Sequence, residues 1–148
     1  MNATLNRIFL SFALIGLFTV SNAFAQKTKV QKLDKRKFAI EIRETTTEGK
    51  KFEKDVFEFT PKEVIGDYFE SKLKVQTIHY KTVKDSSYTD DGSEVKYFQI
   101  SGQEKSGKAD EEYHIEAIVN GRDISGTIKL MKGDIVKKSW EFEGSQNN

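Results

Sequence analysis

Closely spaced strand-like runs between Glu112 and Gly144 constrain the fold of this chain more than any other stretch. Successive side chains of a β-strand point to opposite faces, so alternating apolar and polar residues indicate a strand with one buried face. The first two runs carry their apolar residues in this way, at Tyr113, Ile115, Ala117 and Val119, and then at Ile124, Ile128 and Leu130. Between them, Asn120-Gly121 supplies the positive φ of a tight turn. The pattern predicts an antiparallel hairpin, which a third run extends into a meander.

This third run carries one charged residue on its apolar face. After a turn at Lys132-Gly133, strict alternation places Lys138 beside Val136, Trp140 and Phe142. A lone buried ammonium is strongly destabilising, so Lys138 needs a carboxylate partner, open water, or a β-bulge that turns it outward. Asp55 is the candidate carboxylate, because it shares a predicted face with Phe57 and Phe59. We favour the bulge, and a Lys138–Asp55 pair is the alternative.

Four earlier runs are also predicted as strands, at about 37–44, 52–59, 73–83 and 95–100. Residues 73–83 have apolar side chains on both faces, so their inward register stays open. Residues 45–51, 84–93 and 102–110 are predicted loops, because they are rich in Gly, Asp, Ser and Lys.

Residues 60–63 have the features of a helix start. Thr60 is a capping residue, Pro61 suits the first helical position, and Glu63 follows the cap by three residues. Gly66 and the β-branched Val64 and Ile65 weaken that pattern. We therefore expect one short helix or helical turn near residues 61–72.

The fold class expected from this arrangement is all-β. It contains about seven strands, or eight if residues 63–69 contribute one, and no helix-rich alternation separates them. Short antiparallel strands at regular spacing favour an up-and-down β-barrel or a strongly curved sheet, with a sandwich as the alternative. A barrel also leaves no exposed sheet edge.

The N-terminus has the pattern of an export signal. Arg7 precedes an apolar run over residues 8–20, and Ala23-Phe24-Ala25 fits a signal-peptidase site. The apolar run is shorter than the roughly 20 residues of a membrane span. We expect a signal peptide at 1–25, a basic flexible arm at 26–36, a single β domain at 37–144 and a flexible tail at 145–148, and a periplasmic or secreted protein.

Composition further limits the number of domains and the kinds of protein that this chain can be. Removal of residues 1–25 leaves 123 of the 148 residues, with 23 basic and 23 acidic side chains, so the mature chain is formally neutral. A chain of this size supports one core. Mixed charge gives little support for nucleic-acid binding, and the absence of cysteine rules out disulfides and a lipidated cysteine.

No constellation of residues in the sequence compels a reaction. His79 and His114 have no metal-ligand spacing with another histidine or with cysteine. Asp90-Asp91-Gly92 suggests a calcium loop, but Phe98 stands where the closing glutamate belongs, so a solvated turn is expected. No serine lies in a Gly-x-Ser-x-Gly elbow. We predict no catalytic residue, metal site or cofactor.

Three short motifs after the export signal carry a resemblance. They are residues 55–59 (Asp-Val-Phe-Glu-Phe), 124–127 (Ile-Ser-Gly-Thr) and 139–144 (Ser-Trp-Glu-Phe-Glu-Gly). With them the chain resembles a group of small uncharacterised bacterial secreted proteins of lipocalin-like character. The resemblance implies a calycin-type barrel that holds a hydrophobic ligand at one mouth. An early Gly-x-Trp of ordinary lipocalins is missing, and the only tryptophan is Trp140.

Two functional hypotheses follow. The first is a non-catalytic exported barrel that binds a small apolar or amphiphilic ligand, with Phe57, Phe59, Tyr113, Lys138 and Trp140 as candidate ligand-binding residues. The same aromatic side chains also explain a filled core, since each buried one contributes roughly 1.5–3 kcal/mol. The second is an interaction module, an inhibitor or a binder of an envelope protein, that uses loops 84–94 and 102–110. Convergence of His79 or His114 with two acids in one cleft would favour a third hypothesis, an enzyme.

Overall fold

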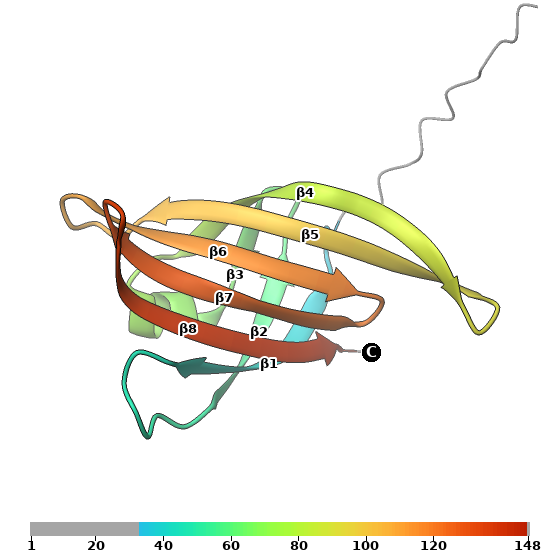
Figure 1. The fold of residues 1–148 in the computed structure, drawn as a ribbon, viewed down its shortest axis with the longest axis horizontal. Helices are drawn as coiled ribbons and strands as arrows, with labels where there is room; N and C mark the ends of the chain where they lie inside the picture. The colour runs from blue at the N-terminus through green and yellow to red at the C-terminus, as the bar shows by residue number, and fades with distance from the viewer. Residues whose placement is uncertain (1–32, 148) are drawn as a thin grey trace, which may run out of the picture.

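The described part of the chain, residues 33–147 of a computed structural model, forms a closed antiparallel barrel. Its eight strands follow one another in sequence order around the barrel, and β1 closes it by pairing with β8 (Figure 1). The elements are β1 (Lys37–Glu44), β2 (Glu53–Phe59), β3 (Glu63–Ile65), a helical turn η1 (Phe69–Leu73), β4 (Thr77–Asp90), β5 (Ser93–Lys105), β6 (Glu111–Asn120), β7 (Asp123–Lys132) and β8 (Ile135–Gln146). The predicted up-and-down barrel is confirmed.

The helical turn forms, but Thr60 does not start it. Thr60 Oγ1 accepts a hydrogen bond from the backbone N–H of Glu63 at 3.0 Å, and the chain then enters β3 rather than a helix. A threonine hydroxyl satisfies a turn by the same bond that it makes at a helix cap. The β-branched Val64 and Ile65 extend as a strand, so the predicted helix start is wrong. β3 is the additional strand that brings the total from seven to eight.

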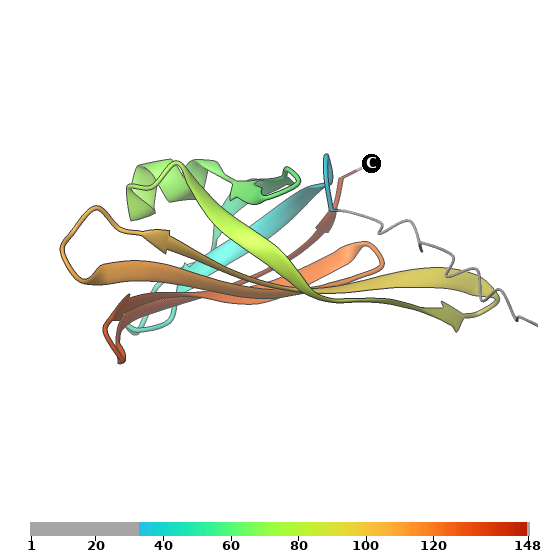
Figure 2. The ribbon, with the colours of Figure 1, turned by 90° about the horizontal axis from the view of Figure 1, so that it is seen from above.

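The predicted loop at residues 84–93 is a paired β-ribbon instead. β4 and β5 continue to a two-residue turn at Asp91-Gly92, where both residues have positive φ (49° and 76°), as a type I′ turn requires. Residues 81–94 are all exposed, so their polar composition reflects two solvent-facing sides rather than a lack of pairing. The ribbon projects beyond the rest of the barrel (Figures 1 and 2). The predicted 102–110 loop is also shorter, since β5 continues to Lys105.

A β-bulge decides the register of the third run of the meander. Leu130 lies opposite Lys138, but Met131 lies opposite Val136, so β8 has one extra residue there. Val136 is consequently exposed, and the prediction that it shares the face of Trp140 and Phe142 is wrong. Trp140 and Phe142 do face inward. The bulge precedes Lys138, which stays in register with them opposite the partly buried Leu130, so the expected outward turn of Lys138 by a bulge is wrong.

The barrel is filled by apolar side chains that its strands and η1 direct inward. The largest fully buried residues are Phe38, Phe57, Phe59, Phe69, Phe98, Leu33, Ile40, Ile42, Ile78, Ile100, Ile115 and Ile128. Ile78 is buried and Tyr80 is partly buried, which resolves the open register of β4. Closure depends on Gly144, because a Cβ there would lie 2.0 Å from the carbonyl oxygen of Ala39 on β1. No helix among residues 33–147 is long and apolar enough to cross a membrane.

The described chain starts inside the predicted basic arm. Leu33 is buried, and Arg36 donates hydrogen bonds from Nε and Nη2 to Gln146 Oε1 at 3.0 and 2.7 Å and from Nη2 to the Gly121 carbonyl. Residues 33–36 therefore pack on the barrel, and β8 reaches Gln146, two residues into the predicted tail. The expected signal peptide and the first residues of the arm lie outside the described residues.

Candidate functional site

The four aromatic residues predicted to bind a ligand lie in the packed core. The ring centroid of Phe57 is 4.8 Å from that of Phe69 and 5.0 Å from that of Phe142, while Phe59 packs edge-on against Phe38. Tyr113 lies 6.1 Å from Trp140. None of the three hollows found in the described part of the chain is lined by Phe57, Phe59, Tyr113 or Trp140. These aromatic residues are brought together as core.

One buried and one partly buried tyrosine tie this core to the backbone. The Tyr113 hydroxyl donates to the carbonyl of Leu73 in η1 at 3.0 Å, and the Tyr80 hydroxyl donates to the carbonyl of Thr60 at 2.7 Å. Burial raises the pKa of both phenols, to about 12 for Tyr80 with a further contribution from Asp34. Both hydroxyls therefore stay protonated donors at neutral pH. They hold η1 and the β2–β3 turn over the interior.

Lys138 and Asp55 have separate partners. Lys138 Nζ lies 3.6 Å from a carboxylate oxygen of Glu44, and about half of its side chain is exposed. Asp55 Oδ2 accepts a hydrogen bond from the backbone N–H of Tyr68 at 2.9 Å and so fixes the chain before η1. The suggested Lys138–Asp55 pair is wrong, because the carboxylate near Lys138 is that of Glu44, which lies opposite Trp140 in the β1–β8 register.

The most prominent hollow lies on the outer wall of the barrel, and we call it the outer trough. Its volume is about 1160 Å³, and it crosses β1, β2, β3, β6, β7 and β8. Its floor is low because small residues occupy it, at Ala39, Ser125, Gly144 and Ser145. A second hollow of about 580 Å³ adjoins it, sharing Ile118, Ser125 and Glu143, and contains Phe52. The two hollows form one continuous surface.

Apolar side chains stand in the outer trough at positions where a barrel ordinarily carries polar ones. Val56, Ile65 and Ile118 are 42%, 39% and 41% exposed, and each has at least one buried neighbour in the sequence. Phe52 is equally exposed in the adjoining hollow. Half of the eight large exposed hydrophobic residues of the described chain therefore gather on this wall. Contiguous apolar surface of this kind, rimmed by polar residues, is typical of an interaction site.

The charged residues of the outer trough are predominantly acidic. Six carboxylates and two ammonium groups line it, a formal net charge of −4: Glu41, Asp55, Glu58, Asp67, Asp123 and Glu143, with Lys37 and Lys54. Lys37 is already paired with Glu58 at 2.8 Å. Glu143 and Asp123 stand on neighbouring strands, β8 and β7. The trough therefore suits a partner that carries positive charge beside apolar groups.

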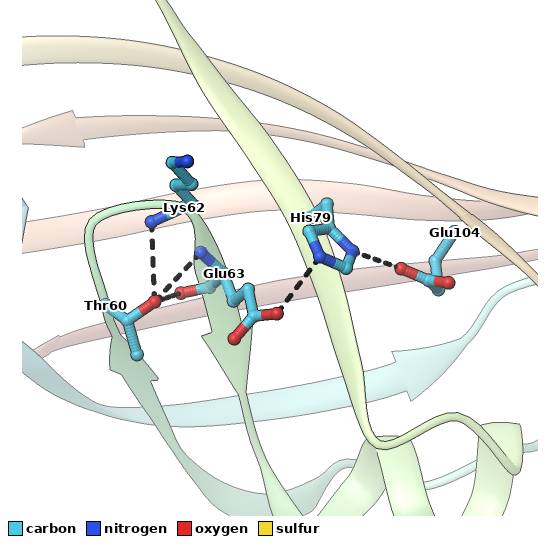
Figure 3. Close-up of polar contacts among 5 residues, drawn as sticks. All are labelled: Thr60, Lys62, Glu63, His79 and Glu104. Carbon is cyan, nitrogen blue, oxygen red and sulfur yellow. Dashed lines mark hydrogen bonds and ion pairs between the residues drawn. The ribbon is translucent and has the colours of Figure 1, made fainter.

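His79 meets two acids, although outside the described hollows. Figure 3 shows its ring on β4 between Glu63 and Glu104, with Nε2 3.0 Å from Glu63 Oε1 and Nδ1 2.6 Å from Glu104 Oε2. The hydrogen bond that the His79 ring donates to Glu104 is the main cause of the raised His79 pKa. The side chain is 60% exposed, and the raised pKa favours the imidazolium form, which has no free lone pair to accept a proton. This arrangement serves as a cross-strand ion-pair network.

The remaining candidate residues do not assemble a metal site. His114 Nε2 lies 2.6 Å from Glu112 Oε1. Within residues 33–147, no group of three or more His, Cys, Asp or Glu side chains is placed to hold a metal ion. Asp91-Gly92 forms the hairpin turn described above.

The outer trough could have been found from the outward register of two apolar residues. Val56 stands between Asp55 and Phe57, and Ile118 stands between Ala117 and Val119, so alternation directs both outward. The signal was weak because each residue also favours a strand wherever it points.

Comparison with protein-family models, curated proteins and solved structures finds no match to this chain.

Proposed function

We propose that this protein is an exported, non-catalytic binding module that holds an extended cationic peptide segment of a partner in the outer trough. The observation that carries the proposal is the concentration of exposed apolar residues over a floor of small side chains, inside a rim of net charge −4. Export is supported by the signal-like residues 1–25. The resemblance to lipocalin-like secreted proteins is compatible with both points.

Apolar contacts and charges have different roles in this proposal. Val56, Ile65 and Ile118 offer apolar area that water leaves on binding, at roughly 25 cal/mol for each Å² buried. Exposed ion pairs contribute only about 0.2–1 kcal/mol each and are screened by salt. The acidic rim therefore sets the sign of charge of the partner and speeds its approach, while the apolar groups supply most of the affinity.

A ligand in the barrel interior is the less supported hypothesis. A small apolar or amphiphilic molecule beside Phe57 and Trp140 would have to displace side chains that already contact one another. Interior packing at crystal-like density leaves little unfilled volume. The interior ligand stays a prediction, whereas the trough is open as it stands.

A fluorescent eight-residue peptide of alternating leucine and lysine is a direct probe of the outer trough. We expect its anisotropy to rise on titration with the protein, and the rise to weaken with added salt. A peptide with glutamate in place of lysine should bind at least about tenfold more weakly, since it meets the acidic rim with like charge. Equal binding of the two peptides would contradict the charge assignment.

Charge reversal in the trough provides the matched test. Asp123→Lys and Glu143→Lys should each weaken the lysine peptide by roughly fivefold or more, because a favourable pair becomes a repulsive one. Glu48→Lys, in the exposed β1–β2 loop outside the trough, makes the same change in net charge and should leave binding unaltered. If all three variants lose affinity equally, the attraction is to net charge and the trough is not the site. A protein lacking residues 26–32 should bind unchanged, and tighter binding would assign the trough to that basic segment instead.

A further inference from the structure

One edge of the projecting ribbon has no strand partner in the described chain. β4 pairs with β5 from His79 to Asp90, but β3 pairs with it only from Thr77 to His79. We call residues Lys81–Asp90 of β4 the ribbon edge. Every residue of this edge is exposed, and Val83 and Tyr88 are its large apolar members. An unpaired edge presents a row of backbone donors and acceptors that another strand can occupy.

One backbone hydrogen bond of β5 shows which residues of the ribbon edge direct these groups outward. The Lys96 carbonyl accepts from the N–H of Gly121, so the backbone groups of Lys96 face away from β4. Ser87 lies opposite Lys96, and residues opposite one another in an antiparallel ladder either both face each other or both face away. Ser87 therefore faces the free edge, and by alternation Asp85 and Thr89 do as well.

We propose that the ribbon edge pairs with the same edge of a second copy of this chain, antiparallel, with Ser87 opposite Ser87 on the two-fold axis. In this register Asp85 lies opposite Thr89, and these residues and Ser87 provide roughly six intermolecular backbone hydrogen bonds. Lys84 lies opposite Asp90 of the second copy, twice by symmetry. Both Lys84 pairs are of the non-hydrogen-bonded kind, in which side chains approach most closely.

Charge selects this register over its neighbours. A shift that centres the axis on Asp85 places two carboxylates opposite one another. A shift that centres it on Ser86 leaves Asp90 opposite Thr82 and Lys84 opposite Tyr88, without an ion pair. Lysine on an edge normally discourages pairing, but in the Ser87-centred register Lys84 gains an acidic partner.

The barrels leave room for this pairing. In the Ser87-centred register the turn residues Asp91 and Gly92 of one copy lie opposite Val83 and Thr82 of the other. The ribbon of the second copy therefore ends before it reaches His79, the last residue of β4 that pairs with β3. An antiparallel two-fold arrangement places the two barrels at opposite ends of the joined ribbons, which project away from each barrel (Figures 1 and 2). The partner that fits this surface is a second copy.

Charge exchange between two variants tests the proposal by sedimentation equilibrium. We expect the unaltered protein to show a concentration-dependent monomer–dimer equilibrium. Lys84→Asp alone and Asp90→Lys alone should each raise the dimer Kd about tenfold or more, because each dimer then contains two like-charged pairs. An equimolar mixture of the two variants should form dimers about as tight as the unaltered protein, since both cross-strand pairs become attractive again.

Matched variants keep the test specific to the ribbon edge. Lys108→Asp and Asp134→Lys make the same charge changes in other exposed turns and should leave the dimer Kd unchanged, alone or mixed. Circular dichroism of each variant checks that the barrel is intact. A protein that is monomeric at every concentration, or a mixture of the two ribbon variants no tighter than either one alone, would overturn the proposal.

Discussion

Replacing Phe57 by alanine is the sharpest test of whether the barrel interior is filled. Phe57 is 0% exposed, and its ring contacts those of Phe69 and Phe142 at centroid distances of 4.8 and 5.0 Å. Truncation of a buried phenylalanine removes its transfer free energy and leaves a cavity, which together cost about 3–5 kcal/mol. At roughly 4 °C for each kcal/mol in a domain of this size, the melting temperature should fall by about 12–20 °C.

The assay is urea and thermal denaturation followed by circular dichroism, with Phe52→Ala as the matched control. Phe52 is 42% exposed, although the guanidinium of Arg43 lies over its ring, so its truncation should cost below about 1 kcal/mol. Benzene provides a second readout, since a newly made apolar cavity binds such molecules. It should stabilise Phe57→Ala and leave the unaltered protein unaffected.

A small loss in Phe57→Ala would refute this reasoning. If the free energy of unfolding falls by less than about 1 kcal/mol, the side chain does not occupy a close-packed interior. Stabilisation of the unaltered protein by benzene would likewise show that a cavity already exists. Either result would support the hypothesis that the barrel interior binds a small ligand.

Three further outcomes follow from particular contacts. Gly144→Ala should cost roughly 1–3 kcal/mol or more in urea denaturation, because its Cβ would meet the Ala39 carbonyl at 2.0 Å, whereas Ser145→Ala should be nearly neutral. Arg36→Ala should cost about 1–3 kcal/mol by losing partly buried hydrogen bonds to Gln146 and Gly121, and Arg43→Ala, which breaks an exposed pair with Glu141, below about 1 kcal/mol. His79 has a folded pKa above its ordinary value of 6.5, so its stabilising effect is present below that pH and is lost as pH rises through the folded pKa. His79→Gln should therefore destabilise the protein at about pH 5.5, by less than about 1 kcal/mol because the ring is exposed, and the effect should diminish as pH rises.

The sequence predicted the barrel because its strands obey local rules. Turns at Asn120-Gly121 and Lys132-Gly133 and the regular alternation of β6 and β7 depend only on neighbouring residues. The need of Lys138 for a carboxylate partner or water was also predictable, because a buried lone ammonium is too costly. Its actual partner, Glu44, was not, since the pairing depends on the register between β1 and β8.

The features that the sequence did not predict depend on which strands lie beside one another and on whether the faces of each strand are covered. The ribbon of β4 and β5 is polar on both sides because neither side is covered, so composition there predicted a loop. Asp91-Gly92 was the available signal, as this dipeptide favours a type I′ turn. The outer trough needs six strands from across the chain to be placed side by side, which no local pattern reports.

Isoleucine methyl NMR tests most directly the central claim that this protein binds through its outer wall. The chain carries isoleucines on both sides of that wall: Ile65 and Ile118 stand in the outer trough, whereas Ile78 and Ile115 are fully buried in the core. During titration with the leucine–lysine peptide, we expect the methyl signals of Ile65 and Ile118 to shift together and saturate, while those of Ile78 and Ile115 stay in place. Shifts confined to Ile78 and Ile115 would contradict the account and place the binding site inside the barrel.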